Sequence, residues 1–114
     1  MVNRRRNIRK RPSYYMEVLD ERTGFSTGTL VNLSTDGLQV SSHKPIDSDS
    51  YFQFGLTISD TLAGEHQLSV DARSVWCQHN VHTNEYDTGF VMVNVDSETE
   101  VVISKALSKY LFKD

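Results

Sequence analysis

The chain has 114 residues, a length that suits one domain with a core of its own. Its net charge is −3, but six of its 12 basic side chains lie within residues 4–11. Residues 12–114 therefore carry six basic and 15 acidic side chains, a balance of −9. Such an acidic body argues against a general nucleic-acid binder, whose basic patch is usually broader.

The sequence contains no signal for secretion or membrane insertion. The single cysteine, Cys77, excludes an intrachain disulfide and agrees with a reducing compartment. The charged N-terminus is not followed by the apolar segment of a secretory signal. No apolar run approaches the ~18 residues that a membrane-spanning helix needs. We therefore expect a soluble cytoplasmic protein.

The basic segment at residues 4–11 has almost nothing apolar to bury. Folding by itself would therefore bring no gain to offset the entropy lost on ordering. Pro12 marks the end of this segment, because proline fixes φ and lacks a backbone N–H. We expect residues 1–12 to form a flexible basic arm that can hold an anion, and residues 13–114 to form a single domain.

Six stretches with the composition or alternation of β-strands follow the arm. In the first of them, Tyr14, Met16 and Val18 share one face. The expected strands are residues 14–20, 25–33, 38–41, 51–58, 67–77 and 86–95, with polar turns between them. Six short antiparallel strands predict a closed or nearly closed β-barrel, because closure removes exposed sheet edges.

The pattern changes after the last strand and predicts an amphipathic helix over residues 97–112. Ser97 and Glu100 have the spacing of a capping box at its start. The helix would cover one open end or one face of the barrel. Its apolar face, at Val102, Leu107 and Leu111, could pack on the barrel or on another subunit.

Two short motifs stand out, Arg5-x-x-x-Arg9, preceded by Arg4, and Asn32-x-Ser34-x-x-Gly37. Room for one strand, a turn and a second strand separates them. In this order, the two motifs resemble the signature of the PilZ domain, R-x-x-x-R ahead of the first barrel strand and D/N-x-S-x-x-G at the end of the second. The stretches 72–76 and 86–90 resemble later strands of the same family, so the resemblance covers nearly the whole chain.

The resemblance implies a ligand, because PilZ domains typically bind the bacterial second messenger cyclic di-GMP. It also implies the residues that hold this ligand. The implied ligand-binding residues are Arg4, Arg5, Arg9, Asn32, Ser34 and Gly37, with Arg5 and Arg9 as the principal pair. An arginine fork suits both the O6 and N7 edge of guanine and a phosphate. The other basic residues of the arm are interpreted as a solvated run that raises the association rate.

The Asn32–Gly37 turn would form the opposite wall of the site. Asn32 and Ser34 are two residues apart, so their side chains are expected on one face, where an amide and a hydroxyl suit a guanine edge or a phosphate oxygen. Gly37 is expected to permit a positive φ and a close approach of the ligand to the backbone. Asp36 is interpreted as a turn residue, because its charge would repel the phosphates.

These features predict a stand-alone receptor that is not an enzyme and takes cyclic di-GMP as its ligand, with no cofactor and no metal. Ligand binding would reorder the arm and so change the surface offered to a protein partner. By resemblance, the partner belongs to flagellar, exopolysaccharide or chemotaxis machinery. The sequence contains no nucleophile elbow, paired-carboxylate site or phosphate-binding loop.

Two other functions fit parts of the sequence. A PilZ-like adaptor could bind proteins without binding nucleotide. A small barrel could instead bind single-stranded nucleic acid, with Tyr14 and Tyr15 as stacking groups, although the acidic body argues against it.

Further along the chain, Cys77-x-His79-x-x-His82 resembles a metal-ligand cluster, but a half-buried cysteine and two loop histidines explain it better. Arg73 could reach the ligand, yet a surface charge pair is the simpler interpretation. Trp76 is interpreted as a core or barrel-rim residue, with a stacking platform for guanine as the alternative.

Overall fold

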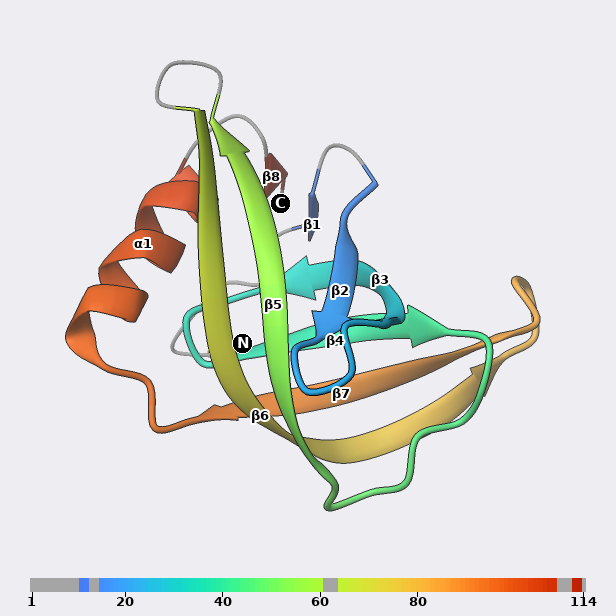
Figure 1. Ribbon diagram of the computed structural model, residues 1–114. Coiled ribbons are helices and arrows are strands. Elements are labelled where there is room, and N and C mark those ends of the chain that lie inside the picture. The colour runs from blue at the N-terminus through green and yellow to red at the C-terminus, as the bar shows by residue number, and fades with distance from the viewer. Residues whose placement is uncertain (1–10, 13–14, 61–63, 109–111, 114) are drawn as a thin grey trace, which may run out of the picture.

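Six strands close into an antiparallel barrel in the computed structural model of the chain, which describes residues 11–12, 15–60, 64–108 and 112–113 (Figure 1). Around the barrel the strands follow the order β2-β3-β4-β7-β6-β5. They are β2 (Glu17–Asp20), β3 (Ser26–Leu33), β4 (Gly37–Ser42), β5 (Tyr51–Asp60), β6 (Gly64–Asn80) and β7 (Glu85–Val93). The predicted six-stranded barrel with a C-terminal helix is confirmed.

The barrel interior follows from the alternation of apolar and polar residues along each strand. Met16, just before β2, and Val18 share one face as predicted, and this face is buried, while Tyr15 is 72% exposed. Tyr14 lies outside the described residues. Phe54 and Phe90 pack edge to face in the centre, with ring centroids 4.9 Å apart. The core is thus built from strands distant in sequence.

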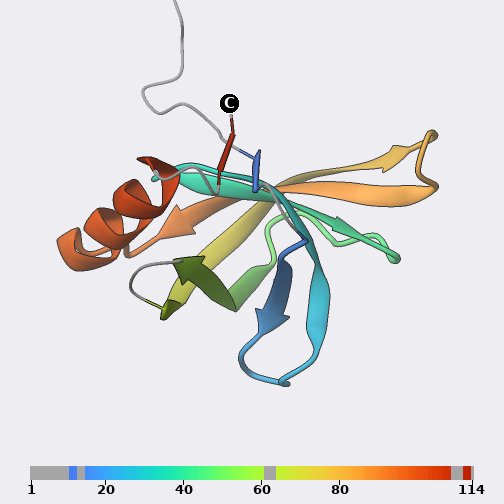
Figure 2. The same cartoon turned by 90° about the horizontal axis from the view of Figure 1, so that it is seen from above.

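β6 and β7 extend beyond the barrel as a two-stranded ribbon, further than the sequence predicts. Figure 2 shows this ribbon projecting on the side opposite to the helix. Across the ribbon, the rings of His79 and Tyr86 lie 5.1 Å apart, and the Asn80 amide donates a hydrogen bond of 3.0 Å to the Asp87 carboxylate. These cross-strand pairs explain why pairing continues where the predicted strands end.

The helix α1 (Ser97–Ser108) packs on the barrel through Ile103, Ala106 and Leu107, all buried. Of the two packing partners left open for its apolar face, the barrel is therefore the one observed. Within the described residues, no helix is long and apolar enough to cross a membrane.

The helix ends at Ser108, four residues before the predicted end. Phe112–Lys113 instead form a short strand, β8, which pairs antiparallel with β1 (Arg11–Pro12). The backbone at Phe112 is extended to meet β1, so a helix cannot continue there. Leu111, expected on the helix face, lies outside the described residues.

β1 also changes the predicted boundary of the arm, since Arg11 and Pro12 are strand residues paired with Lys113 and Phe112 (Figure 1). Proline is tolerated there because β1 is a short strand at the edge of a two-stranded sheet. The rest of the arm, residues 1–10, lies outside the described residues.

The helix begins at Ser97 as predicted, but its N-cap is Asp96 rather than Ser97. The Asp96 carboxylate accepts a 2.7 Å hydrogen bond from the backbone N–H of Thr99, and the Asp96 carbonyl accepts the first helical bond, 3.1 Å from Glu100 N. The capping-box prediction was therefore one residue late. Hydrogen bonds from the backbone and then the side chain of Thr99 hold the pKa of Asp96 below its ordinary value.

We predict that Asp96→Ala lowers the melting temperature at neutral pH, because the cap loses its acceptor. Since folding depresses the pKa of Asp96, the stabilisation is present above the unfolded-state pKa and is lost as the pH falls through the folded-state pKa. The difference from wild type should therefore shrink below about pH 4. Ser97→Ala is the control and should have little effect. A greater loss in the control than in Asp96→Ala would contradict the assignment.

Candidate ligand site

The turn between β3 and β4 is held together by the buried side chain of Ser34, which is 0% exposed. The backbone N–H of Ser34 donates to the Gly37 carbonyl at 2.9 Å, which closes the turn. The Ser34 hydroxyl contacts the Asp36 carboxylate and, at 3.3 Å, the Gly37 carbonyl. In this structure the buried Ser34 side chain therefore stabilises the turn.

Asn32 lies on the outer side of the same hairpin, and its amide Nδ2 donates to Gln39 Oε1 at 3.0 Å. It is partly exposed, whereas Ser34 is fully buried. The structure thus brings Asn32 and Ser34 to one turn but does not place them on the shared exposed face that was expected. β3 ends at Leu33, so Ser34 already belongs to the turn, where the strand alternation on which that expectation depended no longer applies.

Gly37 does not adopt the expected positive φ. Among the described glycines, a φ in the left-handed region is found at Gly24. The two central residues of the β3–β4 turn are Thr35 and Asp36, so Gly37 already belongs to the extended strand β4, where it pairs with Val91 of β7. An extended strand residue has no need of a positive φ.

A row of outward-facing positions runs from this hairpin across the barrel wall. Asn32 lies opposite Gln39, Gln39 opposite Gly89, and Gly89 opposite Trp76. A Cβ built on Gly89 would lie 2.2 Å from Trp76 Nε1, so the missing side chain is what lets the indole lie across β7. Trp76 is 41% exposed and belongs to the outer surface rather than the core.

An open pocket of about 180 Å³ lies between the Asn32–Gly37 turn and this indole. Its described lining residues are Asp36, Val75, Trp76, Gly89, Phe90 and Val91. Asp36 is the acidic member, and the backbone carbonyl of Asp36 accepts a 3.0 Å hydrogen bond from Met92 N of β7. The motif turn therefore stands beside a pocket with one aromatic wall.

Gln39 and Gly89 were not singled out from the sequence, although signals for both exist. A two-residue turn at Thr35 and Asp36 makes Leu33 face Leu38, so Asn32 must face Gln39. Gly89 precedes Phe90 in the stretch that resembled a PilZ strand. Its role in leaving room for the Trp76 indole can be recognised only once the β6–β7 register is known.

The predicted arginines Arg4, Arg5 and Arg9 lie outside the described residues. The structure does place the root of the arm. β1 contacts β3, the strand that carries Asn32. The root of the arm is therefore beside the hairpin.

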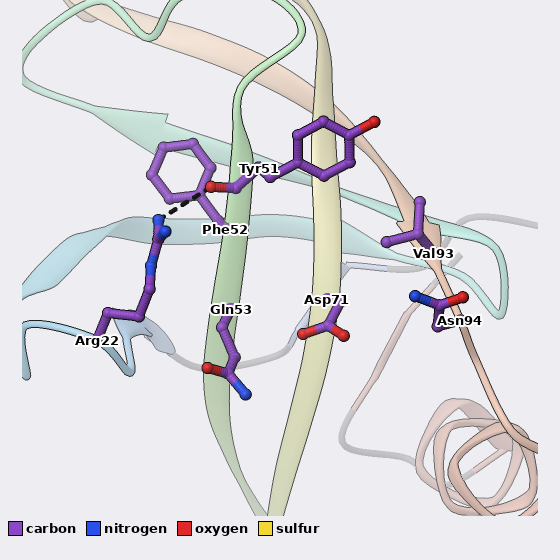
Figure 3. Close-up of a pocket in the computed structure, with 7 residues that line it drawn as sticks. All are labelled: Arg22, Tyr51, Phe52, Gln53, Asp71, Val93 and Asn94. Atoms are coloured by element: carbon purple, nitrogen blue, oxygen red, sulfur yellow. Dashed lines mark hydrogen bonds between the residues drawn. The ribbon is translucent and has the colours of Figure 1, made fainter.

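A second pocket, of about 490 Å³, opens on the outer surface of β5 and β6, and none of its described lining residues is a predicted site residue (Figure 3). Its described lining residues are Arg22, Tyr51, Phe52, Gln53, Asp71, Val93 and Asn94. Arg22 Nη2 donates to the Tyr51 carbonyl at 2.9 Å, and thereby bonds to the β5 backbone just past the end of β2. The Asp71 carboxylate would repel an anion. We therefore assign Arg22 a structural role.

The other residues considered from the sequence, Cys77, His79 and Arg73, make contacts elsewhere in the structure. Cys77 Sγ accepts a 3.5 Å hydrogen bond from Ile46 N, and His79 Nε2 lies 3.0 Å from Asn84 Oδ1. Within the described residues, no three His, Cys, Asp or Glu side chains are grouped to hold a metal ion. Arg73 Nη1 lies 3.3 Å from Asp49 Oδ1 of the loop before β5. None of these groups adds a charge to the motif turn.

Comparison with solved structures supports the fold. The inhibitor of motility MotI/DgrA of Bacillus subtilis is similar with a TM-score of 0.76 and 11% identity, over 93% of this chain and 51% of that one. MrkH of K. pneumonia, in a complex with c-di-GMP, gives a TM-score of 0.69 and 18% identity, over 94% and 52%. This chain thus spans about half the length of either protein.

The PilZ domain of Escherichia coli YcgR with c-di-GMP is matched over most of its own length. It gives a TM-score of 0.66 and 17% identity, over 90% of this chain and 88% of that one. No curated protein matches the chain in sequence. The PilZ domain family matches residues 3–113, nearly the whole chain. The chain therefore belongs to the PilZ domain family.

Proposed function

We propose that this PilZ domain is a receptor for cyclic di-GMP, which binds between the arm and the Asn32–Gly37 turn. The observation that carries the proposal is the position of this turn, beside a pocket walled by Trp76 and at the end of β3, the strand that β1 contacts. Two of the similar structures, YcgR and MrkH, are described as complexes with c-di-GMP. The residues that form the proposed site are Arg4, Arg5, Arg9, Asn32, Ser34 and Gly37.

The chemistry of the ligand fits a site that is formed by a charged arm on one side and a less charged barrel surface on the other. Cyclic di-GMP carries two phosphodiesters and two guanines, so its net charge is negative while its bases offer polar edges and flat faces. Arg5 and Arg9, four residues apart on an extended arm, are separated by up to ~13 Å and can reach different parts of one dinucleotide. A guanidinium can bind a phosphate through two N–H groups or fork onto a guanine.

The barrel supplies the less charged wall. The indole of Trp76 is exposed over Gly89 and offers a flat surface on which a base can stack. Asn32 contributes an amide that can donate and accept. Because Ser34 is buried, we assign it chiefly to holding the turn, with Gly37 as the residue whose carbonyl it contacts.

Signalling in this proposal proceeds through ordering of the arm. Fixing one residue costs about 1–2 kcal/mol, so ordering the seven residues 4–10 ahead of β1 would cost about 7–14 kcal/mol. A micromolar affinity leaves only about 8 kcal/mol net, so the arginine contacts and stacking must far exceed that value. The reordered arm and the adjoining barrel surface would form a new face for a downstream protein, of flagellar, exopolysaccharide or chemotaxis machinery.

We predict that Arg5→Ala and Arg9→Ala each weaken cyclic di-GMP binding by about 10- to 100-fold, because each removes charge-assisted hydrogen bonds. Arg6→Ala is the matched control from the same arm and should change affinity much less. Isothermal titration calorimetry measures the three affinities, and wild-type affinity should fall as salt rises. If both variants bind like wild type, the arm is not the site. If wild type shows neither heat nor a thermal shift, the adaptor function is favoured.

Ser34→Ala should destabilise the domain by about 1–3 kcal/mol and also weaken ligand binding, because the turn loses its internal hydrogen bonds. Thr35→Ala, one residue away in the same turn, should alter both quantities less. Thermal melting and calorimetry would be run on the same samples. Full wild-type affinity in a destabilised Ser34→Ala protein would show that the shape of the turn does not matter for the ligand.

Ligand should also protect the C-terminal strand, because β8 pairs with β1 at the root of the arm. Hydrogen–deuterium exchange with and without cyclic di-GMP is the measurement. We expect slower exchange both at the Arg11 amide and in the peptide covering residues 112–113. Protection confined to the N-terminal peptide would mean that the arm orders without the C-terminal strand.

A further inference from the structure

The pocket between the Asn32–Gly37 turn and Trp76 has an acidic group, Asp36, at the site where an anionic ligand is proposed to bind. The other described lining residues are apolar or aromatic, apart from Gly89. A carboxylate there repels phosphates, so its presence calls for a ligand group that donates hydrogen bonds. The base of a nucleotide carries such groups, whereas its phosphate does not.

The position of Asp36 is set by two sets of contacts. Its backbone carbonyl accepts a 3.0 Å hydrogen bond from Met92 N, which ties the turn to β7. Its carboxylate oxygen Oδ1 accepts the hydroxyl hydrogen of the buried Ser34. An ionised carboxylate has about four acceptor positions, so one bond from Ser34 leaves others for a ligand. Asp36 is exposed, so its carboxylate is a hydrogen-bond acceptor that lies at the surface and is fixed in position.

The chemistry of a carboxylate distinguishes the two purines. Guanine presents two adjacent donors on its Watson–Crick edge, the N1–H and the exocyclic N2–H₂, and a carboxylate can accept from both. Adenine presents an unprotonated N1 at the corresponding position, which a carboxylate repels. A site that pairs with a polar base edge rejects a base that leaves its groups unpaired.

We propose that Asp36 is a specificity-determining residue that selects guanine over adenine, by accepting hydrogen bonds from N1–H and N2–H₂ of a base stacked on Trp76. This inference depends on the proposed function, and it assigns Asp36, the acidic residue of the turn, a role in recognising the base. It departs from the sequence-based interpretation, in which Asp36 served the turn alone.

The test compares cyclic di-GMP with cyclic di-AMP on wild type, Asp36→Asn and Asp71→Asn. The asparagine at position 36 keeps an oxygen to accept the Ser34 hydrogen but loses the paired acceptors. Asp71 is an exposed carboxylate on the outer face of β6 that does not line the Trp76 pocket, so its variant reports the effect of charge alone. Melting temperatures of both variants establish that the fold is intact, and calorimetry gives each affinity.

For Asp36→Asn we expect cyclic di-GMP to bind about 10- to 100-fold more weakly and its preference over cyclic di-AMP to shrink by a similar factor. Asp71→Asn should leave that preference unchanged. Unchanged or tighter binding of cyclic di-GMP by Asp36→Asn, at an unchanged preference, would overturn this inference alone, since it is the result expected of a repelling turn residue. Absence of cyclic di-GMP binding by wild type would overturn the proposed function as well.

Discussion

The hydrogen bonds of one buried hydroxyl, that of Ser34, determine the geometry on which the candidate site depends. Together with the backbone bond from Ser34 N–H to the Gly37 carbonyl, they hold the turn around Thr35 and Asp36 closed, and the closed turn sets the register of β3 against β4. That register puts Asn32 opposite Gln39 and leaves Asp36 against β7, where Met92 N binds its carbonyl. A buried polar group of this kind is costly unless it is satisfied, so the turn has little freedom to adopt another shape.

The site and the core use opposite faces of the same strands. On β7, Phe90 points inward to the aromatic cluster, while its neighbour Gly89 points outward and carries the indole of Trp76. The pocket on the outer face forms where Gly89 lacks a side chain, so it leaves the packing of the interior unchanged. Residues on the outer face can therefore vary the ligand chemistry without opening a cavity in the core, because consecutive strand residues alternate between the two faces.

The features that the sequence predicts well are those set by local pattern. Alternation located the six strands and the buried face of Met16 and Val18, and turn composition located the β3–β4 hairpin. The early end of the helix was not predictable, because Phe112 becomes a strand residue through pairing with Pro12, a hundred residues away. The burial of Ser34 and the extended backbone of Gly37 were not predicted either, because the turn has only two central residues, so Ser34 lies just after β3 and Gly37 already begins β4.

The pairing of β1 with β8 changes how the arm must be considered energetically. A wholly free arm would lose the entropy of every residue that the ligand orders, whereas an arm rooted in a strand has already lost part of it on folding. Because β1 also contacts β3, the root lies beside the hairpin that carries Asn32, so the first ordered arm residues need not search for the site. The same pairing connects the root of the arm to β8, the strand that follows α1, through two residue pairs. A receptor of this construction can couple the proposed ligand to a change near its C-terminal strand without any rearrangement of the barrel itself.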